Sequence, residues 1–135
     1  MFLRDGKLHW EHNYYNEIHY RVTSTETIPP GRHVLSAEVI VDEENKFGTG
    51  GQVTLRLGKQ TIGHGRFDKQ VAGYFTANET FDIGCDTCSP VSDLYESPFA
   101  FTGEIVKVMV DISEATFDQL AEQHEMHVRF ALATQ

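Results

Sequence analysis

Short runs of alternating apolar residues, separated by turn residues, constrain the fold of this chain more than any other feature. Val53, Leu55 and Leu57 alternate with polar residues, and a similar period of two begins at Leu8. This period places successive side chains on opposite faces of a β-strand. Turn signals such as Pro29-Pro30-Gly31 stand between the runs. The chain is therefore expected to be all-β, with short antiparallel strands in a sandwich or a barrel.

The pattern predicts strands over residues 8–14, 18–23, 34–41, 53–57, 71–77, 81–83 and 100–111. A further strand begins at Thr61 and is expected to be interrupted by Gly63 and Gly65. The tail changes period, because Ser113 is a good helix N-cap and Phe117 begins an apolar face with a helical repeat. We expect a β-sandwich domain over residues 1–112 and a C-terminal α-helix within 113–135.

Charge and hydropathy argue against two classes of partner. The formal charge of −9 argues against nucleic acid, because phosphates are neutralised by clustered Lys and Arg. It also argues against an anionic membrane surface. No apolar run reaches the roughly 20 residues of a membrane helix, and residues 1–6 lack the apolar core of a signal peptide. The chain is expected to be cytoplasmic if it is complete, and the alternative is a piece of a longer protein.

An irregular stretch over residues 84–98 holds both cysteines and is a candidate interaction loop. The candidate contact residues in and beside it are Asp82, Cys85, Asp86, Cys88 and Asp93. The Cys-x-x-Cys spacing lacks the second pair of ligands that a zinc site needs. The acids offer oxygen ligands that calcium could use, but they do not form an EF-hand pattern. We therefore expect no metal and no cofactor, with two free thiols and solvated loop acids.

The hairpin predicted near the N-terminus is rich in aromatic residues. If exposed, Trp10 and Tyr15 are candidate contacts for a glycan. The alternative is that alternation turns Trp10 and Tyr14 toward the core, and we favour the core for that face. The chain contains no nucleophile elbow, phosphate-binding loop or metalloprotease helix motif. No catalytic site is expected in it.

Five ordered segments carry a family resemblance: Pro30-Gly31-Arg32-His33-Val34-Leu35, Gly48-Thr49-Gly50-Gly51, Gly63-His64-Gly65-Arg66, Phe81-Asp82-Ile83-Gly84-Cys85-Asp86-Thr87 with Ser89-Pro90-Val91, and Pro98-Phe99-Ala100-Phe101-Thr102-Gly103-Glu104-Ile105. In this order and spacing they resemble the C-terminal accessory domain of bacterial arylsulfatases, over about residues 7–112. The resemblance implies a jelly-roll, concanavalin-like β-sandwich. It also implies a partner, namely a sulfatase catalytic domain in cis or in trans, or a further copy in a homo-oligomer.

The resemblance implies a parent enzyme rather than an enzyme in this chain. Arylsulfatases are sulfuric ester hydrolases that use a formylglycine nucleophile and calcium, both held in a separate α/β domain. The nucleophile arises in a Cys/Ser-x-Pro-x-Arg motif, and the segment from Cys88 to Ser92 has Ser92 where that motif has arginine. We expect a non-catalytic accessory domain. The alternative is a stand-alone carbohydrate-binding module, since the residues from Phe99 to Ile105 also resemble concanavalin-like jelly rolls.

Overall fold

The computed structural model of the protein describes residues 1–43, 46, 48–71 and 81–111 and divides the chain into two compact units, Met1–Glu104 and Ile105–Gln135. Within the described residues the fold is all-β. The strands are β1 (Phe2–Arg4), β2 (Lys7–Tyr14), β3 (Ile18–Thr23), β4 (Leu35–Val41), β5 (Gly51–Leu57), β6 (Gln60–Phe67), β7 (Cys85–Asp86) and β8 (Phe99–Ala100). The helix expected within 113–135 lies outside the described residues. No helix in the described ranges is long and apolar enough to cross a membrane.

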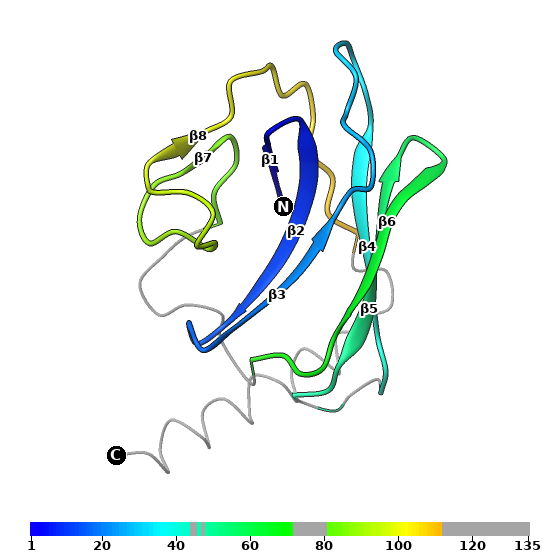
Figure 1. The fold of residues 1–135 in the computed structure, drawn as a ribbon, viewed down its shortest axis with the longest axis vertical. Coiled ribbons are helices and arrows are strands. Elements are labelled where there is room, and N and C mark those ends of the chain that lie inside the picture. The colour runs from blue at the N-terminus through cyan, green and yellow to red at the C-terminus, as the bar shows by residue number, and fades with distance from the viewer. Residues whose placement is uncertain (44–45, 47, 72–80, 112–135) are drawn as a thin grey trace. The chain divides into compact units, whose positions relative to one another are not determined.

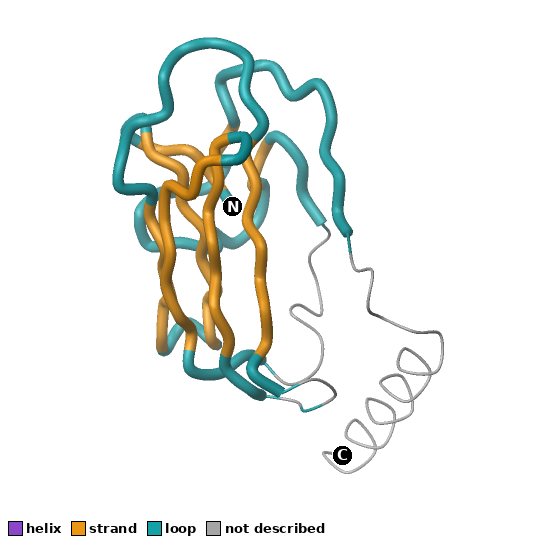
Figure 2. Tube along the Cα trace, turned by 90° about the vertical axis from the view of Figure 1, so that its right-hand side faces the viewer, coloured by secondary structure: helices purple, strands orange, loops and turns teal. Residues whose placement is uncertain are grey.

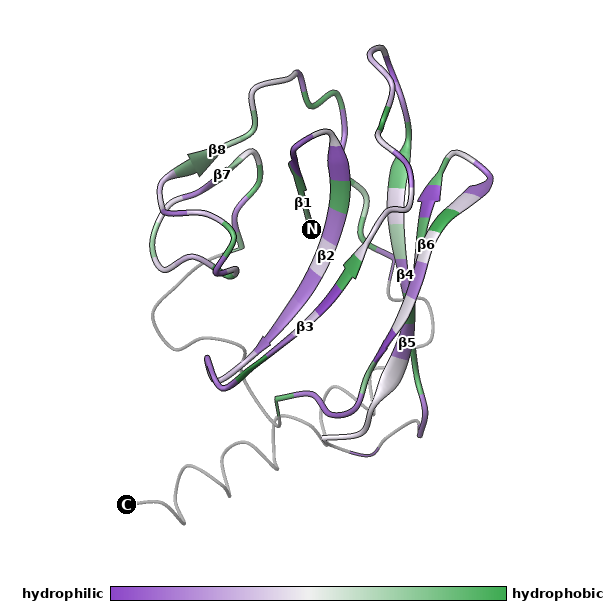
Figure 3. Cartoon of the chain, in the orientation of Figure 1, coloured by the Kyte–Doolittle hydropathy of each residue, from purple (hydrophilic) through white to green (hydrophobic). Residues whose placement is uncertain are grey.

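Three antiparallel sheets are formed, with strand orders β1-β2-β3, β4-β5-β6 and β7-β8 (Figures 1 and 2). In the first two sheets, each strand pairs with its neighbour in the chain. The strands predicted over 8–14, 18–23, 34–41 and 53–57 are confirmed within one or two residues, because their alternation of apolar and polar residues is strong. Figure 3 shows this alternation of hydropathy along the strands.

Backbone conformations with positive φ close two of the hairpins. Asp5 and Gly6 have φ angles of 50° and 73°, which is the conformation of a two-residue turn between β1 and β2. Tyr15 and Asn16 have φ angles of 52° and 59° at the end of the β2–β3 hairpin. The backbone N–H of Asn16 donates to Oδ1 of Asn13 at 2.7 Å, which supports this bend. These turns fix the register of all three strands of the first sheet.

The apolar core joins the first two sheets. Leu8 of β2 and Val22 of β3 contact a set of buried residues from the second sheet: Val53, Leu55, Ile62 and Phe67. Leu8, Val53 and Leu55 are at most 1% exposed. Burial of such side chains stabilises the fold by about 1.5–3 kcal/mol each. The alternation seen in the sequence is therefore explained by one inward face on each sheet.

Two glycines allow β3 to lie close to β6. We expected Gly63 and Gly65 to interrupt this strand, but β6 runs through both of them. A Cβ atom at Gly65 would lie 2.6 Å from Cγ2 of Val22, and one at Gly63 would lie 3.1 Å from the carbonyl oxygen of Thr23. The N–H of Thr25 donates to the carbonyl of Ile62 at 2.7 Å. These glycines therefore serve close packing of two strands rather than a break in one.

Two strand predictions in the last third of the described chain are wrong. The strand expected over residues 100–111 is confined to β8, and residues 101–111 form no strand. Residues 81–83 are also irregular, and the short strand begins instead at Cys85. A strand needs a partner for its backbone groups, and no described segment pairs with either stretch. The strand expected over 71–77 lies almost wholly outside the described residues.

Candidate functional site

The loop over residues 84–98 packs on the face of β2 that points away from the core. Nδ2 of Asn13 donates to the carbonyl of Val91 at 3.2 Å, and the ring of Tyr95 meets Phe2 edge-on at 5.0 Å. His9 and Glu11, which point to this face, are buried at 8% and 7% exposure. Figure 1 shows β7 and β8 beside β1 and β2. The strand β2 is thus covered on both faces, by the core on one side and by this loop on the other.

A carboxylate lies at the centre of this contact. The side chain of Glu11 is fully buried, and its Oε2 accepts from Nε of Arg21 at 2.6 Å and from the Ser92 hydroxyl at 2.8 Å. Its Oε1 lies 2.6 Å from Nδ1 of His19. The Arg21 guanidinium also donates to the Ser92 hydroxyl and forms an ion pair with Asp93. The network thereby joins β2 and β3 to the middle of the loop.

The network determines which charge states are stable. Burial alone would raise the pKa of Glu11, but hydrogen bonds from Arg21, His19 and Ser92 outweigh it and hold that pKa below its usual range. The Arg21 guanidinium likewise lowers the pKa of Asp93. Both carboxyl groups are therefore charged at neutral pH. The charge of Glu11 is buried, whereas Asp93 is exposed, and a buried charge is tolerated only when it is paired and hydrogen-bonded, as Glu11 is here.

The same residues include a set with the chemistry of metal ligands. Glu11, His19 and Asp93 offer ligand atoms that all lie within 4.8 Å of one another. However, the guanidinium of Arg21 already bonds to both carboxylates, and Ser92 and His19 occupy the remaining directions around Glu11. A divalent cation would have to displace this arginine. The geometry is that of an ion-pair network rather than a metal centre.

The acids predicted to form the interaction loop mostly bind groups within the loop. Oδ2 of Asp82 accepts from the backbone N–H and the hydroxyl of Thr87 at 3.1 and 2.9 Å. Oδ2 of Asp86 accepts from the Tyr95 hydroxyl at 2.6 Å and from the backbone N–H of Val91 at 3.3 Å. Asp93 pairs with Arg21, as described above. These acids order the loop, so the expectation of simple solvated carboxylates is incomplete.

The two cysteines and the motif-like segment occupy different environments. Cys85 is half-buried in β7, Cys88 is exposed, and both are free thiols. Ser92, at the position where the sulfatase motif has arginine, is 1% exposed and bonded to Glu11. Its hydroxyl also accepts from the backbone N–H of Leu94 at 3.2 Å. The segment from Cys88 to Ser92 is thus a packing element of the loop.

The aromatic candidates separate into one packed and one exposed residue. Trp10 is half-buried against the core, with its ring 5.6 Å from that of Phe67. Tyr15 is 61% exposed at the hairpin end, and its ring meets that of Tyr14 edge-on at 4.9 Å. Of the two expected glycan contacts, only Tyr15 presents an open ring.

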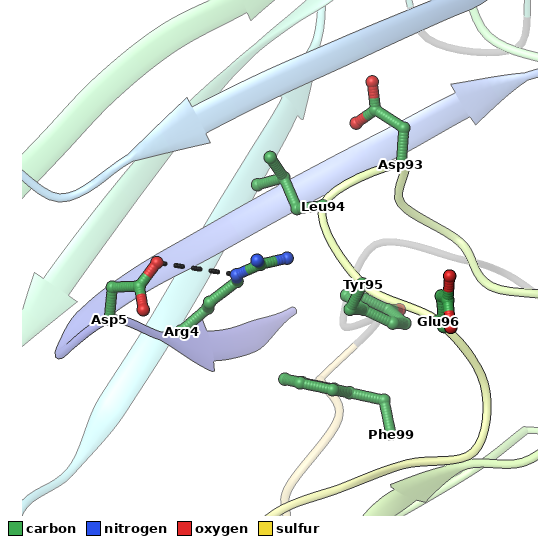
Figure 4. A pocket seen from close by; sticks show the side chains of 7 residues that line it. All are labelled: Arg4, Asp5, Asp93, Leu94, Tyr95, Glu96 and Phe99. Carbon is green, nitrogen blue, oxygen red and sulfur yellow. Dashed lines mark ion pairs between the residues drawn. The ribbon is translucent and has the colours of Figure 1, made fainter.

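An open pocket of about 670 Å³ lies between the end of β1 and the second half of the loop (Figure 4). It is lined by Arg4, Asp5, Asp93, Leu94, Tyr95, Glu96 and Phe99. The rings of Tyr95 and Phe99 stack with their centres 4.2 Å apart. Burial and the hydrogen bond to Asp86 raise the pKa of the Tyr95 phenol, so it stays protonated and donates. The pocket therefore combines an ordered aromatic pair with charged groups of both signs.

Four residues of the network were not predicted as site residues from the sequence: Glu11, Arg21, His19 and Ser92. The signal that would have identified Glu11 and Arg21 is their register, because they lie directly opposite each other in the β2–β3 pairing. A polar residue on a strand normally indicates a solvent-facing side, which is why they were overlooked. Ser92 carries no signal of its own, since its role depends on how a distant loop folds back.

Comparisons with models of protein families, with curated protein sequences and with solved structures find no match for this chain.

Proposed function

We propose that this chain is a non-catalytic accessory domain of an arylsulfatase, packing against the catalytic domain of that sulfuric ester hydrolase in cis or in trans. Two observations support the proposal: residues 7–112 resemble the C-terminal accessory domain of bacterial arylsulfatases, and the loop over 84–98 is anchored to the first sheet. The observation that carries it is that the loop is fastened to β2 and β3, through Ser92 to the buried carboxylate of Glu11 and through Asp93 to Arg21. Preordering of this kind lowers the entropy cost of association.

A second feature supports a contact with another protein surface. Five of the six residues from Ile105 to Val110 are apolar, and they are between 42% and 75% exposed. Contiguous exposed apolar stretches usually mark interaction sites. This segment is therefore a candidate for the surface that the catalytic domain, or another copy of the chain, covers.

We also propose a more specific fold than the antiparallel sheets described above. We propose that the two sheets that share the core of Leu8, Val22 and their neighbours form a β-sandwich of the jelly-roll, concanavalin-like kind. Measured distances between the two sheets in a crystal structure would test this. A crystal structure of the full chain in which every strand pairs only with its neighbour along the chain, as in the first two sheets, would contradict the jelly-roll part of this proposal.

The functional test uses an arylsulfatase catalytic domain from which the natural C-terminal domain has been deleted. We expect fusion of this chain to its C-terminus to raise its melting temperature and its rate of aryl sulfate hydrolysis. The chain alone should give no turnover, and Cys88→Ala should change nothing. Unchanged stability and rate on fusion, or turnover by the chain alone that Cys88→Ala abolishes, would contradict the proposal.

A matched pair of variants locates the contact. Val106→Asp places a charge in the exposed apolar segment, where the side chain is 61% exposed, and it should weaken the gain on fusion. Ile40→Asp places the same charge at a side chain of nearly equal exposure, 62%, on β4. We expect the Ile40 variant to retain the gain. If both variants reduce the gain on fusion equally, the segment from Ile105 to Val110 is not the contact.

A further inference from the structure

We propose that the pocket between β1 and the loop over 84–98 binds a neutral sugar, an inference that goes beyond the accessory role proposed above. The space measures about 670 Å³ and is a shallow depression that opens widely to solvent. The site differs from the glycan contacts expected at Trp10 and Tyr15, because neither residue lines this pocket.

Hydrogen-bond donors and acceptors both reach the pocket. Nε of Arg4 lies 3.5 Å from Oδ2 of Asp5, and the two terminal nitrogens of Arg4 bond to none of the described residues. Figure 4 shows this guanidinium directed toward the side of the pocket formed by Tyr95 and Glu96. The exposed carboxylate of Glu96 makes no hydrogen bond within the described ranges. A sugar hydroxyl both donates and accepts, so it needs both kinds of group.

The aromatic part of the pocket is fixed in advance. The rings of Tyr95 and Phe99 stack at an angle of 18°, and Phe2 meets both of them edge-on, at 5.0 and 6.2 Å. The hydroxyl of Tyr95 is bonded to Asp86, which sets the ring orientation. An ordered ring surface offers apolar contact to the C–H face of a sugar at little entropy cost.

The charged groups of the pocket suit the hydroxyls of a sugar. Three carboxylates, those of Asp5, Asp93 and Glu96, line the pocket and repel an anion. The guanidinium of Arg4 can donate to sugar hydroxyls, and the carboxylate of Glu96 can accept from them. A neutral sugar therefore uses groups of both signs, and a cationic competitor in the test below measures whether the excess of carboxylates selects a cation instead.

The test is a titration of the full chain followed by amide NMR. D-galactose, D-glucose and N-acetyl-D-glucosamine are each added to about 50 mM, a range suited to millimolar dissociation constants. We expect at least one sugar to give saturable shifts at the amides of Arg4, Glu96 and Phe99. Glu96→Gln and Arg4→Gln should each weaken that binding about tenfold, which corresponds to loss of one hydrogen bond to a charged group.

Matched controls make the outcome decisive. Glu17→Gln neutralises another exposed acid, at the β2–β3 turn, and should leave the dissociation constant unchanged. The absence of saturable shifts for all three sugars would overturn the proposal, as would shifts centred on Tyr15. It would also be overturned if Nα-acetyl-lysine amide or methyl sulfate bound more tightly than every sugar. None of these readouts depends on a sulfatase domain, so the accessory role is tested independently.

Discussion

Replacing Arg21 with methionine tests whether the buried ion-pair network fastens the loop to β2. The side chain of Glu11 is fully enclosed, and its Oε2 lies 2.6 Å from Nε of Arg21. Removing one partner of a buried ion pair costs about 3–5 kcal/mol, because the other charge is left uncompensated. Arg21 is a quarter exposed, and His19 and Ser92 still contact Glu11. We therefore expect a smaller loss of unfolding free energy, about 2–3 kcal/mol at pH 7.

The loss caused by Arg21→Met should shrink as the pH falls. In the native network the pKa of Glu11 is below its ordinary value of 4.5. Its contribution to stability is therefore present above that value and is lost as the pH falls through the lowered pKa. Without Arg21, the effect of burial dominates and raises the pKa of Glu11. The carboxyl group then binds a proton more readily, and a neutral acid tolerates burial better than a charged one.

The measurement is urea unfolding followed by the fluorescence of Trp10, which packs against the core. Unfolding free energies are compared at pH 7 and near pH 4, with the slope against urea checked for constancy. The control is Arg56→Met, which breaks an exposed pair with Glu38 and should change stability by less than about 1 kcal/mol. If Arg21→Met costs no more than this control, or costs the same at both pH values, the reasoning about Glu11 is refuted.

Three further predictions concern packing, a phenol and a thiol. Gly65→Ala should lower the unfolding free energy by about 1–3 kcal/mol, because its Cβ would lie 2.6 Å from Cγ2 of Val22. Adding Val22→Ala removes that close contact and should restore part of the lost stability, as measured by thermal unfolding. Tyr95→Phe should cost about 1 kcal/mol through the lost bond to Asp86. Folding raises the pKa of Tyr95 above its ordinary value of 10, so the unfolding free energy should decline as the pH rises beyond 10. The decline should be smaller in Tyr95→Phe, and equal declines of the two proteins in alkaline urea unfolding would contradict this role of Tyr95. Cys88 is exposed and should react with iodoacetamide before the other thiol, as peptide mass mapping would show.

The all-β class and four of the strands could be predicted because alternation is a local signal. Val53, Leu55 and Leu57 face one core, so their spacing alone reveals the strand β5. The strand β1 was missed although Asp5-Gly6 is a strong hairpin signal, because only three residues precede that turn in the strand. Over residues 100–111 the same alternation predicted a strand that does not form beyond β8, because the spacing of apolar residues does not show whether a partner strand is present.

The site was less accessible to sequence reasoning, because its residues are far apart in the chain. Ser92 and Glu11 are separated by 81 positions and meet only when the loop folds back on the first sheet. The acids of the loop were recognised as a group, but their roles depend on partners such as Thr87 and Tyr95. Tyr95 and Phe99 are only four positions apart, but the stacking of their rings depends on how the chain bends between them.

The coverage of β2 on both faces has a consequence for mutational tolerance. Two sets of polar strand residues look alike in the sequence: His9, Glu11 and their neighbours on β2, and Glu38, Thr54 and Arg56 on the second sheet. The first set lies beneath the loop, whereas the second makes its contacts among side chains open to water. Random substitution should therefore accumulate freely in the second set and be purged from the first. Sequencing a library of randomly mutated, folded variants would therefore distinguish the buried polar residues of β2 from the exposed polar residues of the second sheet, which hydropathy does not.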